Sequence, residues 1–257
     1  MTGSLVILRH GESTWNQLNL FTGWHDVPLS PKGLEEAPAA GRTMAEAGLR
    51  FDVAHTSVLT RAVMTCHLAL EAMGQVWLPV QRHWRLNERH YGALQGLDKK
   101  ETTERHGAEQ TRLWRRSFDV PPPAMAPDDP RVVHRDPRYR DVPVASLPLT
   151  ECLRDVVDRV APYFQDRIAP DLRREGEKGG VVMVVAHGNS LRALRMMLEG
   201  ISPHDITELE IPTGIPYLYE LDDALAVING KYLGDPAAAA AAAVAGRLTD
   251  VRQLLRP

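Results

Sequence analysis

Short runs of consecutive apolar residues alternate along the chain with longer segments of helical periodicity. The apolar runs predict strands at 5–8, 51–54, 80–84, 181–185, 217–221 and 225–233. The helical pattern predicts helices at 35–47, 61–73, 100–118, 151–168 and 191–199. Strands that alternate with helices favour a three-layer α/β/α fold around a mostly parallel central sheet. The last two strands, joined by a short Asp-Asp-Ala link, predict a hairpin that adds one antiparallel edge strand.

Two segments break this alternation. Residues 117–150 are rich in proline and have little periodicity, and their many arginines make an ordered lid or flank of a site a better interpretation than a linker. An alanine-rich stretch leads into a C-terminal tail, 247–257, which fits either a frayed end or a docking helix. We therefore expect a single domain over 1–246, with an insertion at about 117–150, followed by that tail.

Composition and charge indicate an ordinary globular protein. The 257 residues are 44% hydrophobic and 25% charged, with a net charge of -3, which does not suit a basic nucleic-acid-binding chain. Cys66 and Cys152 show no CxxC spacing, so we expect no disulfide framework and a reducing compartment. Because no signal peptide fits before Leu5 and no apolar run is long enough to span a membrane, we expect a soluble cytoplasmic protein.

Two predicted strands end in the same kind of motif. The run LVILRHGES, 5–13, stops at an arginine and His10, and the run VVMVVAHGNS, 181–190, stops at His187. One histidine after a strand is more often structural than catalytic. Two copies are stronger evidence, because adjacent parallel strands would bring both histidines to the same edge of the sheet.

Paired histidines of this kind suit phosphoryl transfer. A neutral imidazole can attack a phosphoryl group, and a second imidazole can stabilise the charge that develops on its oxygens. The glycines that follow each histidine allow close approach of backbone amides to an oxyanion. Arg9 and Arg61 stand where they could bind a phosphate in a bidentate manner, although any single arginine could equally be a surface residue.

Proton transfer needs a further group, and the loop NERHYGALQG, 87–96, offers Glu88. A surface carboxylate paired with Arg89 is an equally good interpretation from spacing alone. Lys99 is a stronger candidate for binding an anion because lysine is rare in this chain. The helical pattern instead indicates that the neighbours Arg115 and Arg116 are surface residues. No metal-binding motif is present, so a mechanism without metal is the simpler expectation.

Seven blocks of sequence together resemble one family. They are RHGESTWN (9–16), FTGWHDVPLS (21–30), TSVLTRA (56–62), LNERHYGALQGL (86–97), LWRRSF (113–118), AHGNSLRAL (186–194) and IPTGIPYLYEL (211–221). In this order they resemble the cofactor-dependent phosphoglycerate mutases of the histidine phosphatase superfamily, and the likeness runs from about residue 5 to about residue 246. The tail GRLTDVRQLLRP departs from the short lysine-containing end that is common in that family.

The resemblance implies roles for individual residues. His10 would be the phosphorylated nucleophile and Glu88 the proton donor and acceptor, while His187, Arg9 and Arg61 would stabilise the transferring phosphoryl group. The implied substrate-binding residues are Arg9, Ser13, Asn16, Thr22, Gly23, Arg61, Glu88, Arg89, Tyr91, Lys99, Arg115, Arg116, Gly188 and Asn189. The resemblance thus reverses the surface interpretation of the two neighbouring arginines. Serine at position 13 is also what mutases of the family carry, where bisphosphoglycerate synthases tend to have glycine.

The implied reaction is the interconversion of 3-phosphoglycerate and 2-phosphoglycerate, in glycolysis and gluconeogenesis, through a phosphohistidine primed by 2,3-bisphosphoglycerate. The family also implies small phosphoglycerates as the only partners, no nucleic acid or membrane, and a homodimer or homotetramer. A broad-specificity histidine phosphatase is the first alternative, because it would share both histidines, Arg9 and Arg61. A non-enzymatic phospholigand-binding module is the second.

Overall fold

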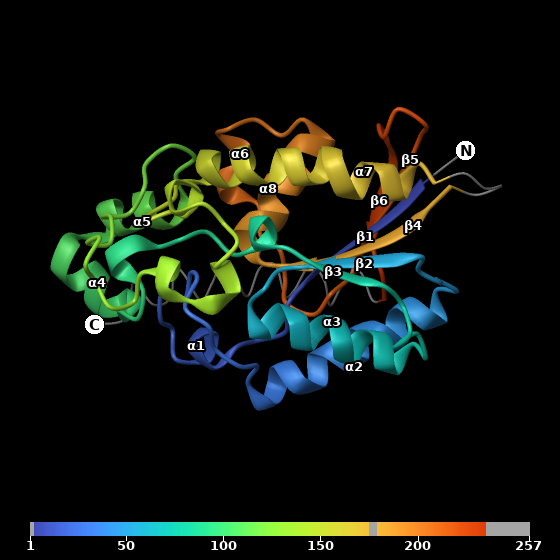
Figure 1. Ribbon diagram of the computed structural model, residues 1–257, viewed down its shortest axis with the longest axis horizontal. Coiled ribbons are helices and arrows are strands. Elements are labelled where there is room, and N and C mark those ends of the chain that lie inside the picture. Colours follow the sequence, from blue (N-terminus) through green and yellow to red (C-terminus); the bar gives the residue numbers. More distant parts are fainter. Residues whose placement is uncertain (1–2, 175–178, 235–257) are drawn as a thin grey trace.

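The computed structural model describes residues 3–174 and 179–234, and within that part of the chain six strands form one sheet (Figure 1). The strand order is β3-β2-β4-β1-β5-β6. The strands are β1 (Gly3–Arg9), β2 (Val53–Thr56), β3 (Val80–Arg82), β4 (Val181–Ala186), β5 (Tyr217–Leu221) and β6 (Val227–Tyr232). Neighbours among β1 to β4 pair in parallel, and β5 pairs antiparallel with both β1 and β6. The predicted fold class is confirmed, and the hairpin provides the antiparallel edge.

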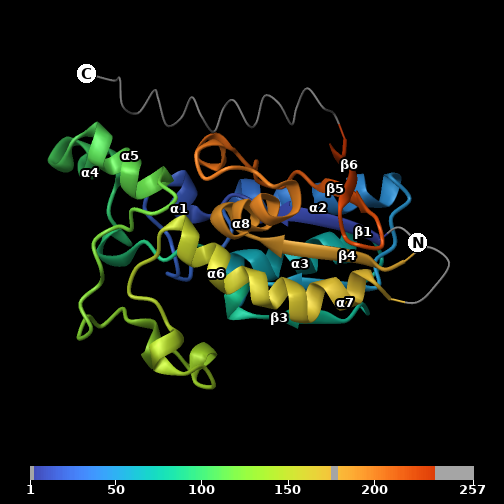
Figure 2. The same ribbon diagram turned by 90° about the horizontal axis from the view of Figure 1, so that it is seen from above.

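Helices cover both faces of the sheet. The α-helices of the described residues are α1 (Thr14–Gln17), α2 (Pro31–Glu46), α3 (Thr60–Ala72), α4 (Lys99–His106), α5 (Ala108–Arg116), α6 (Leu153–Tyr163), α7 (Ala169–Leu172) and α8 (Gly188–Glu199). Helices α2 and α3 lie on one face, and α6, α7 and α8 lie on the other (Figures 1 and 2). Helices α4 and α5 lie beyond the end of the sheet where β1 finishes, opposite the end where the chain enters it.

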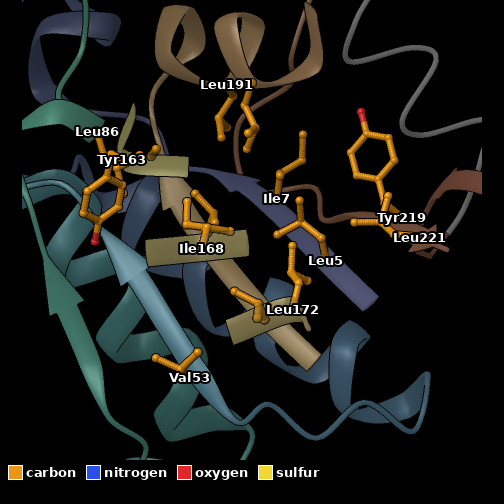
Figure 3. Packing of buried hydrophobic residues seen from close by; sticks show 14 of the residues in the cluster. Leu5, Ile7, Val53, Leu86, Tyr163, Ile168, Leu172, Leu191, Tyr219 and Leu221 are labelled. Carbon is orange, nitrogen blue, oxygen red and sulfur yellow. The ribbon is translucent and has the colours of Figure 1, made fainter. Parts of the chain in front are cut away.

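The central strand β1 shows why the sheet is covered on both sides. Its residues alternate between the two faces, as extended backbone requires. Leu5 and Ile7 pack with the cluster under α6, α7 and α8 (Figure 3), whereas Val6 and Leu8 pack with the cluster under α2 and α3. All four side chains are buried. A continuous apolar run is therefore the expected sequence of this strand.

The predicted helix at 100–118 is wrong in one respect, because the chain forms two helices there. Gly107 separates α4 from α5 with a φ of 83°, a backbone conformation that glycine adopts without steric cost. The predicted helix at 151–168 begins at Leu153 and continues through a π-helical turn, Phe164–Ile168, into α7. The helix at α1 was not predicted, since four residues are too few to show a period.

The proline-rich segment 117–150 packs on the rest of the molecule. It contains three short 3-10 helices, Val133–Arg135, Pro137–Tyr139 and Val144–Ser146. Tyr139 is buried and stacks on Trp24 with ring centroids 5.2 Å apart, and its hydroxyl accepts a hydrogen bond from the Asn87 side chain at 2.9 Å. The segment thus packs on the loops around residues 24 and 87.

Three further expectations concern the chain as a whole. Cys66 and Cys152 are both buried free thiols. Among the helices of the described residues, none combines the length and apolar character that crossing a membrane requires. The tail at 247–257, with the 235–246 stretch before it, lies outside the described residues.

Candidate active site

The ends of two neighbouring strands bring the two predicted histidines together. In the parallel pairing of β1 with β4, Arg9 stands opposite Ala186, so that His10 and His187 follow side by side. The His10 backbone amide donates to the Ala186 carbonyl at 3.0 Å. The two imidazole centroids are 4.9 Å apart, and both side chains are buried. The prediction that both histidines meet at one edge of the sheet is confirmed.

The imidazole of His10 is held in one tautomer. Its Nδ1 lies 2.7 Å from the carbonyl oxygen of Gly11. Because a carbonyl can only accept, Nδ1 carries the proton and Nε2 keeps its lone pair. Burial lowers the pKa of His10 well below its ordinary value, and the nearby Arg61 and Arg9 lower it further. The ring is therefore neutral at neutral pH, as a nucleophile must be.

His187 has a different partner. Its Nε2 lies 2.7 Å from the hydroxyl of Ser57, which also accepts a hydrogen bond from the Leu59 backbone amide at 3.2 Å. Burial, then Arg61 and His10, lower the pKa of His187 well below its ordinary value. When the serine hydroxyl donates to Nε2, the proton of the neutral ring lies on Nδ1, which has no hydrogen-bond partner among the described residues. His187 then offers a donor for an oxyanion.

Two arginines are fixed around this pair. Arg9 donates from Nη1 to the Ile211 carbonyl at 2.8 Å, and its buried Nε has no hydrogen-bond acceptor within the described ranges. Arg61 is buried and donates from Nη2 to the Gly23 carbonyl at 2.7 Å and from Nη1 to the His25 carbonyl at 3.0 Å. Burial lowers the pKa of Arg61 to about 10, so the guanidinium remains charged at neutral pH. The positive charge is thus positioned before any ligand binds.

Glu88 lies inside the same pocket, so the alternative of a surface carboxylate is wrong. Its Oε1 accepts hydrogen bonds from the Arg89 amide at 2.8 Å and from the Asn189 amide and side chain at 3.0 and 2.9 Å. Burial alone would raise the pKa of Glu88, but these hydrogen bonds, with Arg9 and Arg61, lower it below its ordinary value. The group is a carboxylate in this state.

The second oxygen of Glu88 stands close to the chain at Gly188. A Cβ atom added to that glycine would lie 3.6 Å from Glu88 Oε2 and 3.7 Å from the Arg9 guanidinium. Glycine therefore leaves space between the strand end and the carboxylate. Since Oε1 already accepts three hydrogen bonds, Oε2 is the oxygen that can exchange a proton with a ligand.

The pocket around these groups has a volume of about 270 Å³. Predicted residues on its wall are Arg9, His10, Asn16, Thr22, Gly23, Arg61, Glu88, Tyr91, Lys99, Arg115, Arg116, Gly188 and Asn189. The neighbouring arginines that read as surface residues therefore both reach it. They do so because α5 ends at the pocket, where its last turn exposes two successive side chains.

Three predicted residues do not line the pocket. Ser13 caps α1, where its hydroxyl accepts from the Asn16 amide at 3.2 Å. Arg89 is buried behind the wall, with its guanidinium 4.7 Å from the Tyr91 ring and a hydrogen bond to the Arg115 carbonyl. His187 is buried beside His10, with the two ring centroids 4.9 Å apart. Ser13 and Arg89 therefore act on the pocket through their neighbours.

Sequence reasoning also missed residues of the wall, namely Glu12, Asn19, Leu20, Arg192, Glu210 and Thr213. A signal existed for Arg192, because it follows Asn189 by three residues in α8 and so shares its face. Glu210 lies in a connection without periodicity, and nothing in the sequence marks it. Ser57 had a signal as well, since it follows β2 directly.

Among the described residues, no group of three or more histidine, cysteine, aspartate or glutamate side chains is arranged to hold a metal ion. The side chains instead suit an organic anion. Six cationic residues line the pocket, Arg9, Arg61, Lys99, Arg115, Arg116 and Arg192. Guanidinium and ammonium groups bind phosphate and carboxylate oxygens. The donor set fits a ligand that carries more than one anionic group.

Comparison with known proteins agrees with this chemistry. The sequence model of the histidine phosphatase superfamily (branch 1) matches residues 5–229. A protein of Nitratidesulfovibrio vulgaris strain Hildenborough named 2,3-bisphosphoglycerate-dependent phosphoglycerate mutase is 57% identical over 248 residues, which are 95% of this chain and 98% of that protein. A second strain, DP4, has a protein of the same name that is 56% identical over the same length.

Solved structures share the fold. A phosphoglycerate mutase from Bacillus anthracis superposes with a TM-score of 0.64 at 22% identity, covering 93% of this chain and 96% of that one. A mycobacterial glucosyl-3-phosphoglycerate phosphatase superposes with a TM-score of 0.68 at 23% identity, covering 90% of this chain and 97% of that one. At these identities the likeness concerns the fold and not the substrate.

Proposed function

The chain belongs to the histidine phosphatase superfamily, and from that premise we propose that it interconverts 3-phosphoglycerate and 2-phosphoglycerate after priming by 2,3-bisphosphoglycerate. The observation that carries this proposal is the 57% identity, over nearly the whole chain, to a protein named as such a mutase. The geometry of the pocket supports it, because a neutral nucleophile, a carboxylate and six cations face one cavity.

We place the substrate's two anionic groups at two ends of the cationic wall. The phosphoryl group that reacts lies at His10, between Arg9 and Arg61, whose charges both act on that imidazole. The other anionic group lies at Arg115 and Arg116, the last two residues of α5. A ligand with a single phosphate would contact only one of these two groups of arginines. This arrangement favours phosphoglycerates over simple monoesters.

Phosphoryl transfer begins at His10. In priming, Nε2 attacks a phosphorus atom of 2,3-bisphosphoglycerate, the N–P bond forms and the bond from phosphorus to the ester oxygen breaks. Arg9, Arg61 and the Nδ1–H of His187 stabilise the charge on the equatorial oxygens, while the Gly11 carbonyl stabilises the positive charge that develops on the His10 ring. The leaving ester oxygen takes up a proton from solvent, which Glu88 Oε2 can relay, so that phosphohistidine and one monophosphoglycerate result.

Glu88 accounts for the protons. When the C2 hydroxyl of 3-phosphoglycerate attacks the phosphohistidine, Glu88 Oε2 takes the hydroxyl proton, and the bisphosphate and free His10 are formed. After the bisphosphate turns around in the pocket, His10 attacks the phosphoryl group on the C3 oxygen. Glu88 returns the proton to that oxygen, which releases 2-phosphoglycerate and restores the phosphohistidine. Water must stay out, since hydrolysis of phosphohistidine would make the enzyme a phosphatase.

The test is an assay of purified protein with 3-phosphoglycerate and a trace of 2,3-bisphosphoglycerate, in which 2-phosphoglycerate and free phosphate are measured together. We expect 2-phosphoglycerate as the main product and no turnover by His10→Ala. Release of phosphate as the main product would instead support the broad-specificity phosphatase. Binding of 3-phosphoglycerate without either product would support the non-enzymatic module.

We further propose, from the family, that the chain assembles as a homodimer or homotetramer, binds no nucleic acid or membrane, and works in the cytoplasm. A mass measurement in solution tests the assembly, and a monomer would contradict it.

A further inference from the structure

One carboxylate in the pocket has no part in the mechanism above. Glu210 lies on the wall, and its side chain is only 10% exposed. Its Oε1 forms an ion pair with Nη2 of Arg116, and its Oε2 lies 3.3 Å from Nη2 of Arg192. A pocket that has to bind anions therefore holds a negative charge against two of its own cations.

Of these two cations, Arg192 is fixed. Its Nε donates to the Leu209 carbonyl at 2.7 Å, its Nη1 donates to Asn189 Oδ1 at 3.2 Å, and its side chain is 10% exposed. Burial lowers the pKa of Arg192 to about 10, which leaves it charged at neutral pH. Because Asn189 in turn donates to Glu88 Oε1, the carboxylate of Glu210 is tied to the same framework as the reacting groups.

Arg116 is attached differently. It is the last residue of α5, at the end of a helix, and its side chain is more exposed, at 18%. Glu210 is thus held from one side by a guanidinium with several backbone and side-chain partners. On its other side, Glu210 contacts Arg116, which binds an anionic group of the substrate in the proposed function.

We propose that Glu210 is an internal competitor of the substrate, which occupies Arg116 in the free protein and gives way when the second anionic group of a phosphoglycerate binds there. This inference rests on the proposed function. The exchange is a movement of the Arg116 side chain, with no covalent step. Because the negative charge stays in the pocket, it weakens the binding of every anion, and most strongly that of a group placed beside Arg116. Glu210 thereby sets the affinity and selectivity of the site.

Substitution by glutamine tests the charge with little change of shape. For Glu210→Gln we expect the KM for 3-phosphoglycerate to fall by about three- to thirtyfold with kcat changed less than about threefold, as removal of one nearby charge implies. Glu210→Asp, which keeps the charge on a shorter side chain, should lower the KM less than Glu210→Gln does. The matched control is Glu208→Gln, since Glu208 pairs with Arg112 and its side chain is 59% exposed.

Two outcomes would overturn the proposal. A KM that rises in Glu210→Gln would mean that the carboxylate holds Arg116 in position for the substrate and does not compete with it. An unchanged KM would mean that the charge of Glu210 has no effect on binding.

Binding without turnover separates this inference from the proposed function. Titration calorimetry with 3-phosphoglycerate, and separately with inorganic phosphate, uses the unphosphorylated protein and needs no mutase activity. We expect Glu210→Gln to lower the Kd of 3-phosphoglycerate more than that of phosphate. Equal changes in both Kd values, or none, would contradict the inference even if the protein is a mutase. Conversely, a protein without mutase activity that shows the expected difference would refute only the proposed reaction.

Discussion

At the scale of single residues, phosphoryl transfer to His10 depends on the protonation of its imidazole. Burial and two arginines lower its pKa, and the Gly11 carbonyl fixes the proton on Nδ1. We predict that the ¹⁵N shifts of the His10 ring stay those of a neutral imidazole between pH 8 and 6, whereas free histidine has its midpoint at about 6.5. Comparison with His10→Ala assigns the signal. A midpoint at the free value would contradict the proposed preorganisation.

Glu88 gives a second prediction at this scale. In Glu88→Gln the Oε1 acceptor remains for Asn189 and the Arg89 amide, but the side chain can no longer carry the proton. We expect kcat to fall by about 10²- to 10⁴-fold with a small change in the KM for 3-phosphoglycerate, which steady-state kinetics can measure. Glu104→Gln, whose parent side chain is 65% exposed, is the control. Activity near the wild-type level would remove Glu88 from its proposed role.

Some residues could be predicted from sequence and others could not. His10 and His187 could be predicted because each follows an apolar strand and precedes a glycine. Ser57 follows a strand directly, but its role depends on a contact with a histidine 130 residues away, and Glu210 acts only through arginines on two separate helices. Partners so distant along the chain are set by the packing of the elements, which no local pattern contains.

At the scale of elements, a buried ion pair joins α6 to the loop that carries Glu88. Arg159 donates from Nε to Glu151 at 2.6 Å and from Nη2 to the Asn87 and Glu88 carbonyls, both at 2.9 Å. Glu151 also accepts from the His90 amide at 2.7 Å. Both side chains are almost fully buried. The pair holds the backbone of the loop in place.

This pair predicts a coupled loss of stability. Arg159→Leu or Glu151→Leu alone leaves one charge buried without its partner, so we expect each to lower the free energy of unfolding by about 3–5 kcal/mol. Replacing both should cost clearly less than the sum of the two single changes, which a double-mutant cycle of urea unfolding measures. Additive losses would show that the two charges do not stabilise each other.

Prediction of whole elements succeeded where the periodicity was long. The strands and the main helices followed from apolar runs and helical spacing. The division between α4 and α5 did not, because Gly107 is tolerated inside helices and its φ of 83° is set by how the two helices pack. The π-helical turn before α7 could not be predicted either, since a segment of 5 residues is too short to show a period of its own.

At the scale of the molecule, alternation of strands and helices predicted the layers but not the order of the strands. The site exists because β4, from late in the chain, lies between β1 and β2. Paired HG motifs at strand ends suggested that β1 and β4 are neighbours, and this was the one long-range contact that the sequence supported. The register that sets Arg9 beside Ala186 needed the structure.

Histidines that are buried or half-buried also give the whole protein a pH dependence. Burial, with Arg159 and Arg131 nearby, lowers the pKa of His90 to about 3, and burial with Arg85 and Arg167 lowers that of His83 to about 4. In the unfolded chain such groups have a pKa of about 6.5. Between the folded and unfolded pKa values only the unfolded state takes up the protons. The free energy of unfolding is therefore highest above pH 6.5 and decreases as the pH falls.

Urea unfolding between pH 7 and 5 measures this loss. The Gly92 amide donates a hydrogen bond to His90 Nδ1 at 3.0 Å, and the asparagine oxygen in His90→Asn can accept it instead. Below pH 6 we expect this variant to reduce the slope of the free energy of unfolding against pH by about 1.4 kcal/mol per pH unit. A slope equal to that of the wild type would show that His90 is protonated in the folded state.

The central claim is that His10 carries the phosphoryl group. The most direct measurement is the intact mass of the protein after brief exposure to 2,3-bisphosphoglycerate, for the wild type and for His10→Ala. We predict an addition of one phosphoryl group to the wild type, lost on acid treatment as expected for a phosphohistidine, and none to the variant. A wild type without the addition, or a variant with the same addition, would contradict it.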